Sequence, residues 1–153
     1  EFVSPALSEF HGCDYTLRAG VLLPRNFGDE DSYPVVYSVT GFGGSYEDIR
    51  NWEKRVTPGS PLDDCIVVVP DANNRYGHSV FCDSACIGPW GRALVTEFIP
   101  ALEAEFSGAG AEHRYVTGVS SGGWSSFWLQ VTYPEAFAGC WSHVPDPIDN
   151  RLR

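Results

Sequence analysis

Two short runs of mostly β-branched residues, YPVVYSVTG at 33–41 and CIVVVPD at 65–71, most constrain the fold of this chain. Strands that are apolar along nearly their whole length are buried on both faces, which is typical of parallel sheets between layers of helices. The stretch between the two runs, SYEDIRNWEKR at 45–55, has the composition of a short helix. A helix between two such strands favours a parallel sheet.

The same alternation continues along the rest of the chain. Strand-like and helix-like periods of apolar residues predict further elements, in the order strand, helix, strand, helix and strand, at residues 15–24, 92–106, 113–120, 122–134 and 137–144. We expect Pro100 to kink the first of these helices, because proline lacks the backbone N–H that a helix interior needs. We therefore predict an α/β fold, a mostly parallel sheet with helices on both faces, in one domain over residues 1–153.

The charge of the chain argues against two classes of partner. The net charge is −10 and the isoelectric point is near 4.6, whereas nucleic acids and anionic membrane surfaces are bound by clustered Lys and Arg. No run approaches the roughly 18 apolar residues that span a bilayer, and the first ten residues show no signal peptide. We expect the chain as given to be soluble, and its compartment stays unassigned.

A long irregular stretch, residues 72–91, follows the second buried strand. Loops of this length in a compact domain are usually functional or disordered. His78, Cys82 and Cys86 within it do not have a standard zinc spacing, so we expect no metal and no cofactor. The odd number of cysteines, 5, does not suggest a complete disulfide framework, and Cys82 and Cys86 are either a small loop disulfide or free thiols.

The stretch GVSSGGWSS, residues 118–126, has the form of a nucleophile elbow. Its G-x-S-x-G pattern follows a predicted strand and precedes a predicted helix, which is the setting that a reactive serine needs. Gly118 and Gly122 allow a tight turn from which Ser120 points out of the sheet. We predict Ser120 as a catalytic nucleophile, and the alternative is a structural serine at the start of a helix.

An acyl-transfer serine also needs backbone N–H groups that point at the developing oxyanion. One comes from the residue after the nucleophile, and the other comes from a loop after an earlier strand. These positions correspond to Ser121 and to the loop TGFGG at 40–44, in which we predict Phe42 as the second donor. Both positions lie at the C-terminal ends of predicted parallel strands, where such sheets bind ligands. The alternative is that GFGG is only a flexible turn.

Four segments occur in the order TGFGGSYEDIRNW, IVVVPD, GPWGRALVTEFIPALEAEF and RYVTGVSSGGWSSFWLQVTYPEAFAG. Together they resemble the putative esterase family of α/β-hydrolases, which includes S-formylglutathione hydrolase, feruloyl esterases, enterochelin esterase and the mycolyltransferases. The resemblance implies a small carboxylic ester as substrate and an acyl-serine intermediate, which passes its acyl group to water or, in an acyltransferase, to an alcohol. It also implies that Gly41 and Trp90 contact the substrate, and packing is the alternative role for Trp90.

The other members of a catalytic triad are harder to place. In this fold their order is serine, acid and histidine, but after Ser120 the histidine is His143 and the aspartates are Asp146 and Asp149. This order is reversed. We therefore expect His143 to be a polar residue at the rim of the site rather than the base.

Of the histidines before the elbow, His78 is the one candidate near the site, since His113 begins its strand at the opposite end. A serine without a base is a poor nucleophile. We therefore expect that the acid and the histidine lie outside the sequence, that residues 1–153 form an incomplete domain, and that this chain is weak or inactive. The alternative is a catalytically dead module for binding or assembly. The last strand would then be an open edge, through which the chain can self-associate.

Overall fold

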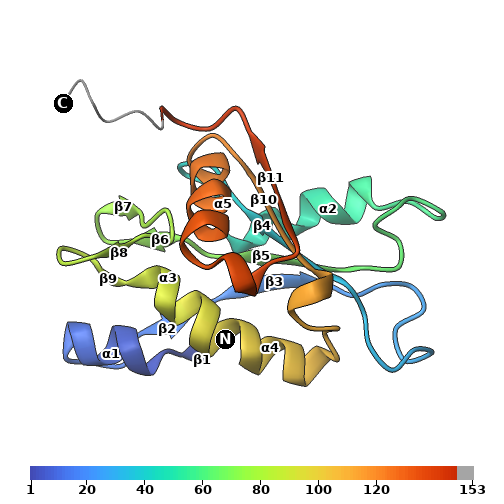
Figure 1. Ribbon diagram of the computed structural model, residues 1–153, viewed down its shortest axis with the longest axis horizontal. Coiled ribbons are helices and arrows are strands. Elements are labelled where there is room, and N and C mark those ends of the chain that lie inside the picture. The colour runs from blue at the N-terminus through green and yellow to red at the C-terminus, as the bar shows by residue number, and fades with distance from the viewer. Residues whose placement is uncertain (148–153) are drawn as a thin grey trace.

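The computed structural model describes residues 1–147, and its centre is a five-stranded sheet (Figure 1). The strands lie in the order β11 (Gly139–His143), β10 (Arg114–Val119), β4 (Val35–Val39), β5 (Ile66–Pro70) and β3 (Ala19–Leu22). The first four strands are parallel, and β3 is antiparallel to β5. The predicted α/β fold with a mostly parallel sheet is confirmed.

Helices cover both faces of the sheet, as the sequence predicts. On one face, α2 (Ile49–Arg55) and the 3-10 turn before it (Tyr46–Asp48) contact β3 and β5. The other face is covered by α5 (Ser121–Thr132) and by a long composite helix. This composite helix consists of α3 (Trp90–Ala93), a π-helical turn (Leu94–Phe98) and α4 (Ile99–Phe106). Figure 1 shows α2 on the opposite side of the strands from α5.

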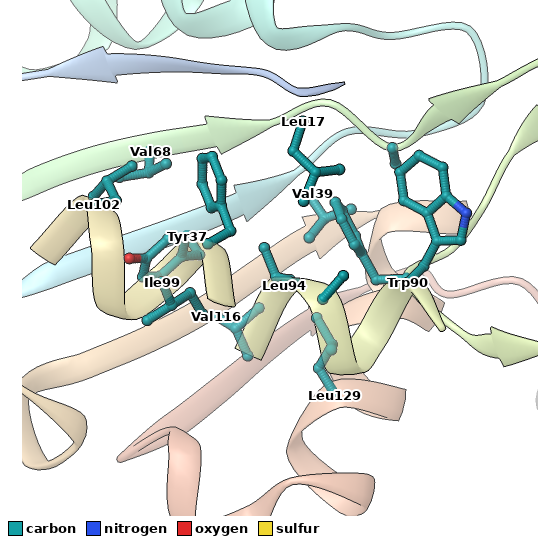
Figure 2. Packing of buried hydrophobic residues seen from close by; sticks show 14 of the residues in the cluster. Leu17, Tyr37, Val39, Val68, Trp90, Leu94, Ile99, Leu102, Val116 and Leu129 are labelled. Atoms are coloured by element: carbon teal, nitrogen blue, oxygen red, sulfur yellow. The ribbon is translucent and has the colours of Figure 1, made fainter. Parts of the chain in front are cut away.

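The hydrophobic core lies between the sheet and this second group of helices. The strand register places Val116 beside Tyr37 and Tyr37 beside Val68, so these side chains form a row on one face. Figure 2 shows Ile99 of α4 and Leu129 of α5 close to this row. Each of these five residues exposes 1% of its surface or less to solvent. The core therefore fixes both helices on the strands that carry the candidate site.

A buried ion pair adds a polar connection between α4 and the sheet. Two nitrogens of Arg114 donate to the Glu103 carboxylate, each at 2.6 Å, and the Tyr37 hydroxyl donates to the same carboxylate at 3.3 Å. Burial and the negative charge of Glu103 raise the pKa of Tyr37 far above its ordinary value, so the phenol stays protonated. These bonds stabilise the charges of Arg114 and Glu103, because either charge would be costly to bury without a partner.

Three segments differ from the prediction in detail. Residues 15–24 form two strands rather than one, because β2 (Thr16–Leu17) leaves the main sheet to pair with β1 (Phe2–Val3). The helix expected at 92–106 has its π-helical turn just before Pro100, where the regular hydrogen-bond ladder must lose a donor. The stretch 72–91 is not irregular throughout.

That stretch contains two small hairpins, made of β6 (Asn73–Asn74) with β7 (Gly77–His78) and of β8 (Asp83–Ser84) with β9 (Gly88–Pro89). Strands of two residues are too short to show an alternating pattern in the sequence. The remaining elements, also short, are the helix α1 and two 3-10 turns, at Pro5–His11, Ala111–His113 and Pro134–Ala136. Within residues 1–147, no helix is long and apolar enough to cross a membrane.

The strand β11 forms one edge of the sheet and pairs only with β10 among the described residues. Its Trp141 side chain is 70% exposed and stacks on His143, with 5.0 Å between the ring centroids. The neighbouring strand adds Tyr115 and Val119, which are also exposed. Register places Trp141 and His143 on the same face as these two residues. Among residues 1–147, β11 is therefore an edge strand, and exposed apolar side chains lie beside it.

Candidate active site

Ser120 lies at the turn between β10 and α5, at the C-terminal end of an interior parallel strand. Its backbone has φ 56° and ψ −123°, and a strained conformation of this kind costs a residue with a side chain about 1–3 kcal/mol. The Ser120 N–H donates to the His143 carbonyl at 3.1 Å, and the Ser120 carbonyl accepts from the Trp124 N–H at 2.9 Å. These bonds fix the backbone of Ser120 between the end of β11 and the first turn of α5.

The two glycines of the motif are needed because α5 begins very close to β4. A Cβ atom on Gly122 would lie 2.1 Å from the Val39 carbonyl oxygen, and one on Gly118 would lie 2.2 Å from the Gly122 carbonyl oxygen. Real Cβ atoms essentially never approach non-bonded atoms this closely. The motif therefore places the start of α5 directly beside the end of β4, and the loop that leaves β4 comes next to Ser120.

That loop, residues 40–44, lies against the turn that carries Ser120. A Cβ on Gly41 would be 3.3 Å from the Val119 carbonyl oxygen and 3.6 Å from Ser120 Cβ. Phe42 is 75% exposed, and its ring lies over Gly77, where an added Cβ would be 3.0 Å from the ring. The hairpin β6–β7 therefore supports the loop from outside. The Asn73 side chain also donates to the Gly44 carbonyl at 2.7 Å.

The group that contacts the Ser120 hydroxyl is Asp146, which follows β11. Ser120 Oγ donates to Asp146 Oδ1 at 3.1 Å, and Ser121 Oγ donates to Asp146 Oδ2 at 2.7 Å. In the sequence, Asp146 is only a candidate triad acid in the wrong order, and its contact with Ser120 is not predicted. The sequence signal that could have indicated it is the position of Asp146 after β11, because loops at this end of neighbouring parallel strands converge.

The imidazole of His78 is close to the site, but each of its two nitrogens already has a hydrogen-bond partner other than Ser120. Its Nε2 lies 3.0 Å from the Thr40 carbonyl oxygen, and its Nδ1 accepts from the Val80 N–H at 3.0 Å. Nδ1 must therefore be unprotonated and Nε2 must carry the proton. Burial lowers the pKa of His78 below its ordinary value, although the Thr40 carbonyl and the charges of Asp71 and Asp146 oppose this shift. His78 holds the loop at 40–44 through Thr40 and does not hydrogen-bond to Ser120.

This arrangement agrees with a comparison against known protein families. Residues 8–149 match the family described as "Putative esterase". The chain belongs to this esterase family. The resemblance predicted from the sequence segments is therefore confirmed. No curated protein matches the chain.

Solved structures show the fold of this esterase-family chain in other proteins. A CE1 ferulic acid esterase from Anaeromyces mucronatus, in complex with ferulic acid, has a TM-score of 0.70 and 16% identity, and the match covers 95% of this chain and 56% of that one. An S-formylglutathione hydrolase from Agrobacterium tumefaciens has a TM-score of 0.71 and 20% identity, and the match covers 94% of this chain and 56% of that one.

A third structure is the fluorophosphonate-binding serine hydrolase F of Staphylococcus aureus, with a TM-score of 0.70 and 17% identity, and with 94% and 55% covered. The chain thus spans about half the length of these solved structures.

The two predicted substrate contacts, Gly41 and Trp90, line different pockets. Gly41 lines one of about 280 Å³, together with Trp52 of α2 and the ends of β10 and β11. Trp90 lines another of about 270 Å³, with Asp71 and Asn73. Trp90 is 1% exposed and its indole N–H donates to the Ile87 carbonyl at 3.0 Å. It therefore packs in the core, and a contact between its ring and substrate stays a prediction.

No other described histidine donates to or accepts from the Ser120 hydroxyl, whose hydrogen bond goes to Asp146. His143 is exposed and stacks on Trp141, and only its backbone carbonyl contacts Ser120. His113 is at the start of β10, opposite the elbow, as predicted. Asp149 lies outside the described residues. Among residues 1–147, no histidine nitrogen forms a hydrogen bond with Ser120.

The structure gives no support for a metal centre in the part of the chain that it describes. No group of three or more His, Cys, Asp or Glu side chains is placed to hold a metal ion there. Cys82 and Cys86 are free thiols, so of the two alternatives the disulfide is the one not formed. Burial and the nearby charge of Asp83 raise the pKa of the Cys82 thiol above its ordinary value, which favours the protonated form.

Proposed function

We propose that this chain carries the nucleophile half of a serine carboxylic-ester hydrolase, with Ser120 as the nucleophile. The observation that carries the proposal is the strained backbone of Ser120, φ 56°, in the turn between a parallel strand and a helix. Strain of this kind is stored at functional sites when the surrounding structure fixes it. Membership of the esterase family supports the same chemistry.

The proposed reaction proceeds through an acyl-serine. Ser120 Oγ attacks the carbonyl carbon of a small ester, and the negative charge moves to the carbonyl oxygen. The N–H groups of Phe42 and Ser121 stabilise this oxyanion. The alcohol leaves, and water then attacks the acyl-serine and releases the acid. Gly41 has no side chain, so the substrate can approach the loop that carries the Phe42 N–H.

The full triad of such an enzyme contains a histidine, and we propose that the triad acid and histidine come from outside this sequence. Two observations support this: within residues 1–147 both nitrogens of His78 are engaged elsewhere, and the chain spans about half the length of the structures that it matches. The expected consequence is weak hydrolysis by this chain, because general acid–base catalysis contributes about 10²–10⁴-fold in rate.

A fluorophosphonate probe tests the proposal, because it reacts covalently with activated serines. We expect labelling of the folded chain, mapped to Ser120 by peptide mass spectrometry and abolished by Ser120→Ala. A folded chain that stays unlabelled would instead indicate a module that keeps the fold for binding or assembly. Product analysis with an added alcohol then separates a hydrolase, which releases the acid, from an acyltransferase, which forms a new ester.

The open edge of β11 supports a second part of the proposal, namely association of two copies through this strand. Within residues 1–147 no second strand pairs with the outer side of β11, and Trp141 adds exposed apolar surface beside it. Two antiparallel copies of β11 would join the sheets into one and cover both tryptophans.

A further inference from the structure

The loop after β11 places a carboxylate on the candidate nucleophile itself. Asp146 accepts a hydrogen bond from Ser120 Oγ at 3.1 Å, within the range expected between a base and the proton that it removes. The two residues are 26 positions apart in the chain. Their contact therefore depends on the fold, because β10 and β11 end side by side.

Three features hold this carboxylate in place. Its second oxygen accepts a bond of 2.7 Å from Ser121 Oγ, whose residue is buried at the first position of α5. Asp146 also lies between Pro145 and Pro147, whose rings fix the backbone on both sides. The tight packing of α5 extends to this loop, because a Cβ on Gly123 would be 3.2 Å from Pro145 Cα.

The position also favours a negatively charged group. Ser121 is the first residue of α5, a helix of 12 residues, and the N-terminal end of a helix attracts anions. The Ser121 hydroxyl directs its proton at the carboxylate as well. The serine, the carboxylate and the hydroxyl that orients it thus follow the logic of a nucleophile, a base and a third group that positions the base.

We propose that Asp146 is a catalytic residue, which accepts the proton of Ser120 and gives this chain a serine–aspartate dyad. This inference rests on the proposed function, because it requires Ser120 to be the nucleophile. The proton moves from Ser120 Oγ to Asp146 Oδ1 as the bond from Oγ to the carbonyl carbon forms. When the bond to the alcohol breaks, the same proton passes to the leaving oxygen.

The second half of the cycle uses the same group. Asp146 takes a proton from water while the water oxygen bonds to the acyl carbon. The bond from the acyl carbon to Oγ then breaks, and Oγ receives the proton. Serine and carboxylate return to their starting states, and the reaction consumes one ester and one water. No further reactant is needed, and Ser121 Oγ acts as a positioning group throughout.

The rate of fluorophosphonate labelling of the full chain tests the dyad. We expect Asp146→Asn and Asp146→Ala to slow labelling by about 10²-fold, the lower end for loss of a general base. Ser121→Ala should slow it less, because the carboxylate loses only its orienting bond. Asp29→Asn is the matched control, since Asp29 is exposed in a loop and the variant removes one charge elsewhere. Circular dichroism checks that each variant is folded.

A chemical rescue separates a proton acceptor from a structural residue. Added formate can occupy the space of the missing carboxylate, so we expect it to restore part of the rate in Asp146→Ala and none in Ser120→Ala. Unchanged or faster labelling of folded Asp146→Asn, while Ser120→Ala stays unlabelled, would overturn the dyad and leave the proposed function standing. Absence of labelling in the unsubstituted chain would contradict both.

Discussion

At the scale of single residues, the candidate site depends on backbone positions as much as on side chains. Ser120 and the glycines beside it set a tight turn. The Phe42 ring packs on Gly77, and His78 hydrogen-bonds to Thr40 and Val80. The Phe42 ring is 75% exposed, so its side chain contributes little to the core. What the proposed chemistry requires from this residue is its N–H.

Substitution by proline tests this role directly. Phe42→Pro removes the N–H, and we expect the rate of ester hydrolysis or of fluorophosphonate labelling to fall by about 10²-fold, the effect of losing one oxyanion-hole donor. Phe42→Ala keeps the N–H and is the control, with an expected change of less than about threefold. Equal rates in the two variants would count against Phe42 as a donor.

His78 predicts a pH dependence of stability. Its folded-state pKa is lowered below the ordinary value of 6.5, so above that pH the residue is neutral in both states. As the pH falls below it, the unfolded chain binds a proton that the folded chain does not, and the free energy of unfolding decreases. Between pH 7.5 and pH 5.5, we expect the free energy of unfolding to fall less for His78→Gln than for the unsubstituted chain, as measured by urea unfolding. The difference between the two losses should be about 1 kcal/mol at most. Equal losses would contradict this assignment.

At the scale of elements, the contact between α5 and β4 builds the site. The closest approach is at Gly122, where a Cβ would be 2.1 Å from the Val39 carbonyl oxygen. We expect Gly122→Ala to lower the free energy of unfolding by about 1–3 kcal/mol, as overpacking does in a close-packed interior. Gly139→Ala is the control, because its Cβ would be 3.6 Å from Tyr115, an ordinary contact. Urea denaturation measures both, and similar values would rule out this close approach.

The edge strand β11 predicts association of the chain. We expect sedimentation velocity to show a dimer whose fraction increases with protein concentration. Trp141→Lys should shift the equilibrium toward the monomer, because an exposed lysine blocks pairing at an edge. Phe127→Lys on α5 is a control at another exposed aromatic residue. A chain that stays monomeric at all concentrations would contradict association through β11.

The sequence predicts the strands and helices around the elbow well, for a physical reason. The runs at 33–41 and 65–71 are buried on both faces, so their apolar character is continuous and easily recognised. The hairpins of 72–91 escape prediction because strands of two residues have no periodicity. The contact of Asp146 with Ser120 escapes it too, since the position of Asp146 after β11 places it near the site but does not specify which side chains meet.

At the scale of the whole molecule, the fold brings together parts of the chain that are distant in the sequence. The loop after β4, the turn after β10 and the loop after β11 all lie at the C-terminal end of the parallel strands. The chain spans about half the length of the structures with this fold. We therefore expect an activity lower than that of a complete triad, carried by Ser120 with the carboxylate beside it.

Trapping an acyl-enzyme is the most direct test of the central claim, that Ser120 forms an ester with the acyl group of its substrate. The folded chain would be incubated with p-nitrophenyl acetate, quenched in acid and digested, and the peptides would be examined by mass spectrometry. We expect one acetyl group on Ser120, absent from Ser120→Ala. Acetylation elsewhere with Ser120 unmodified, or equal acetylation of both proteins, would contradict it.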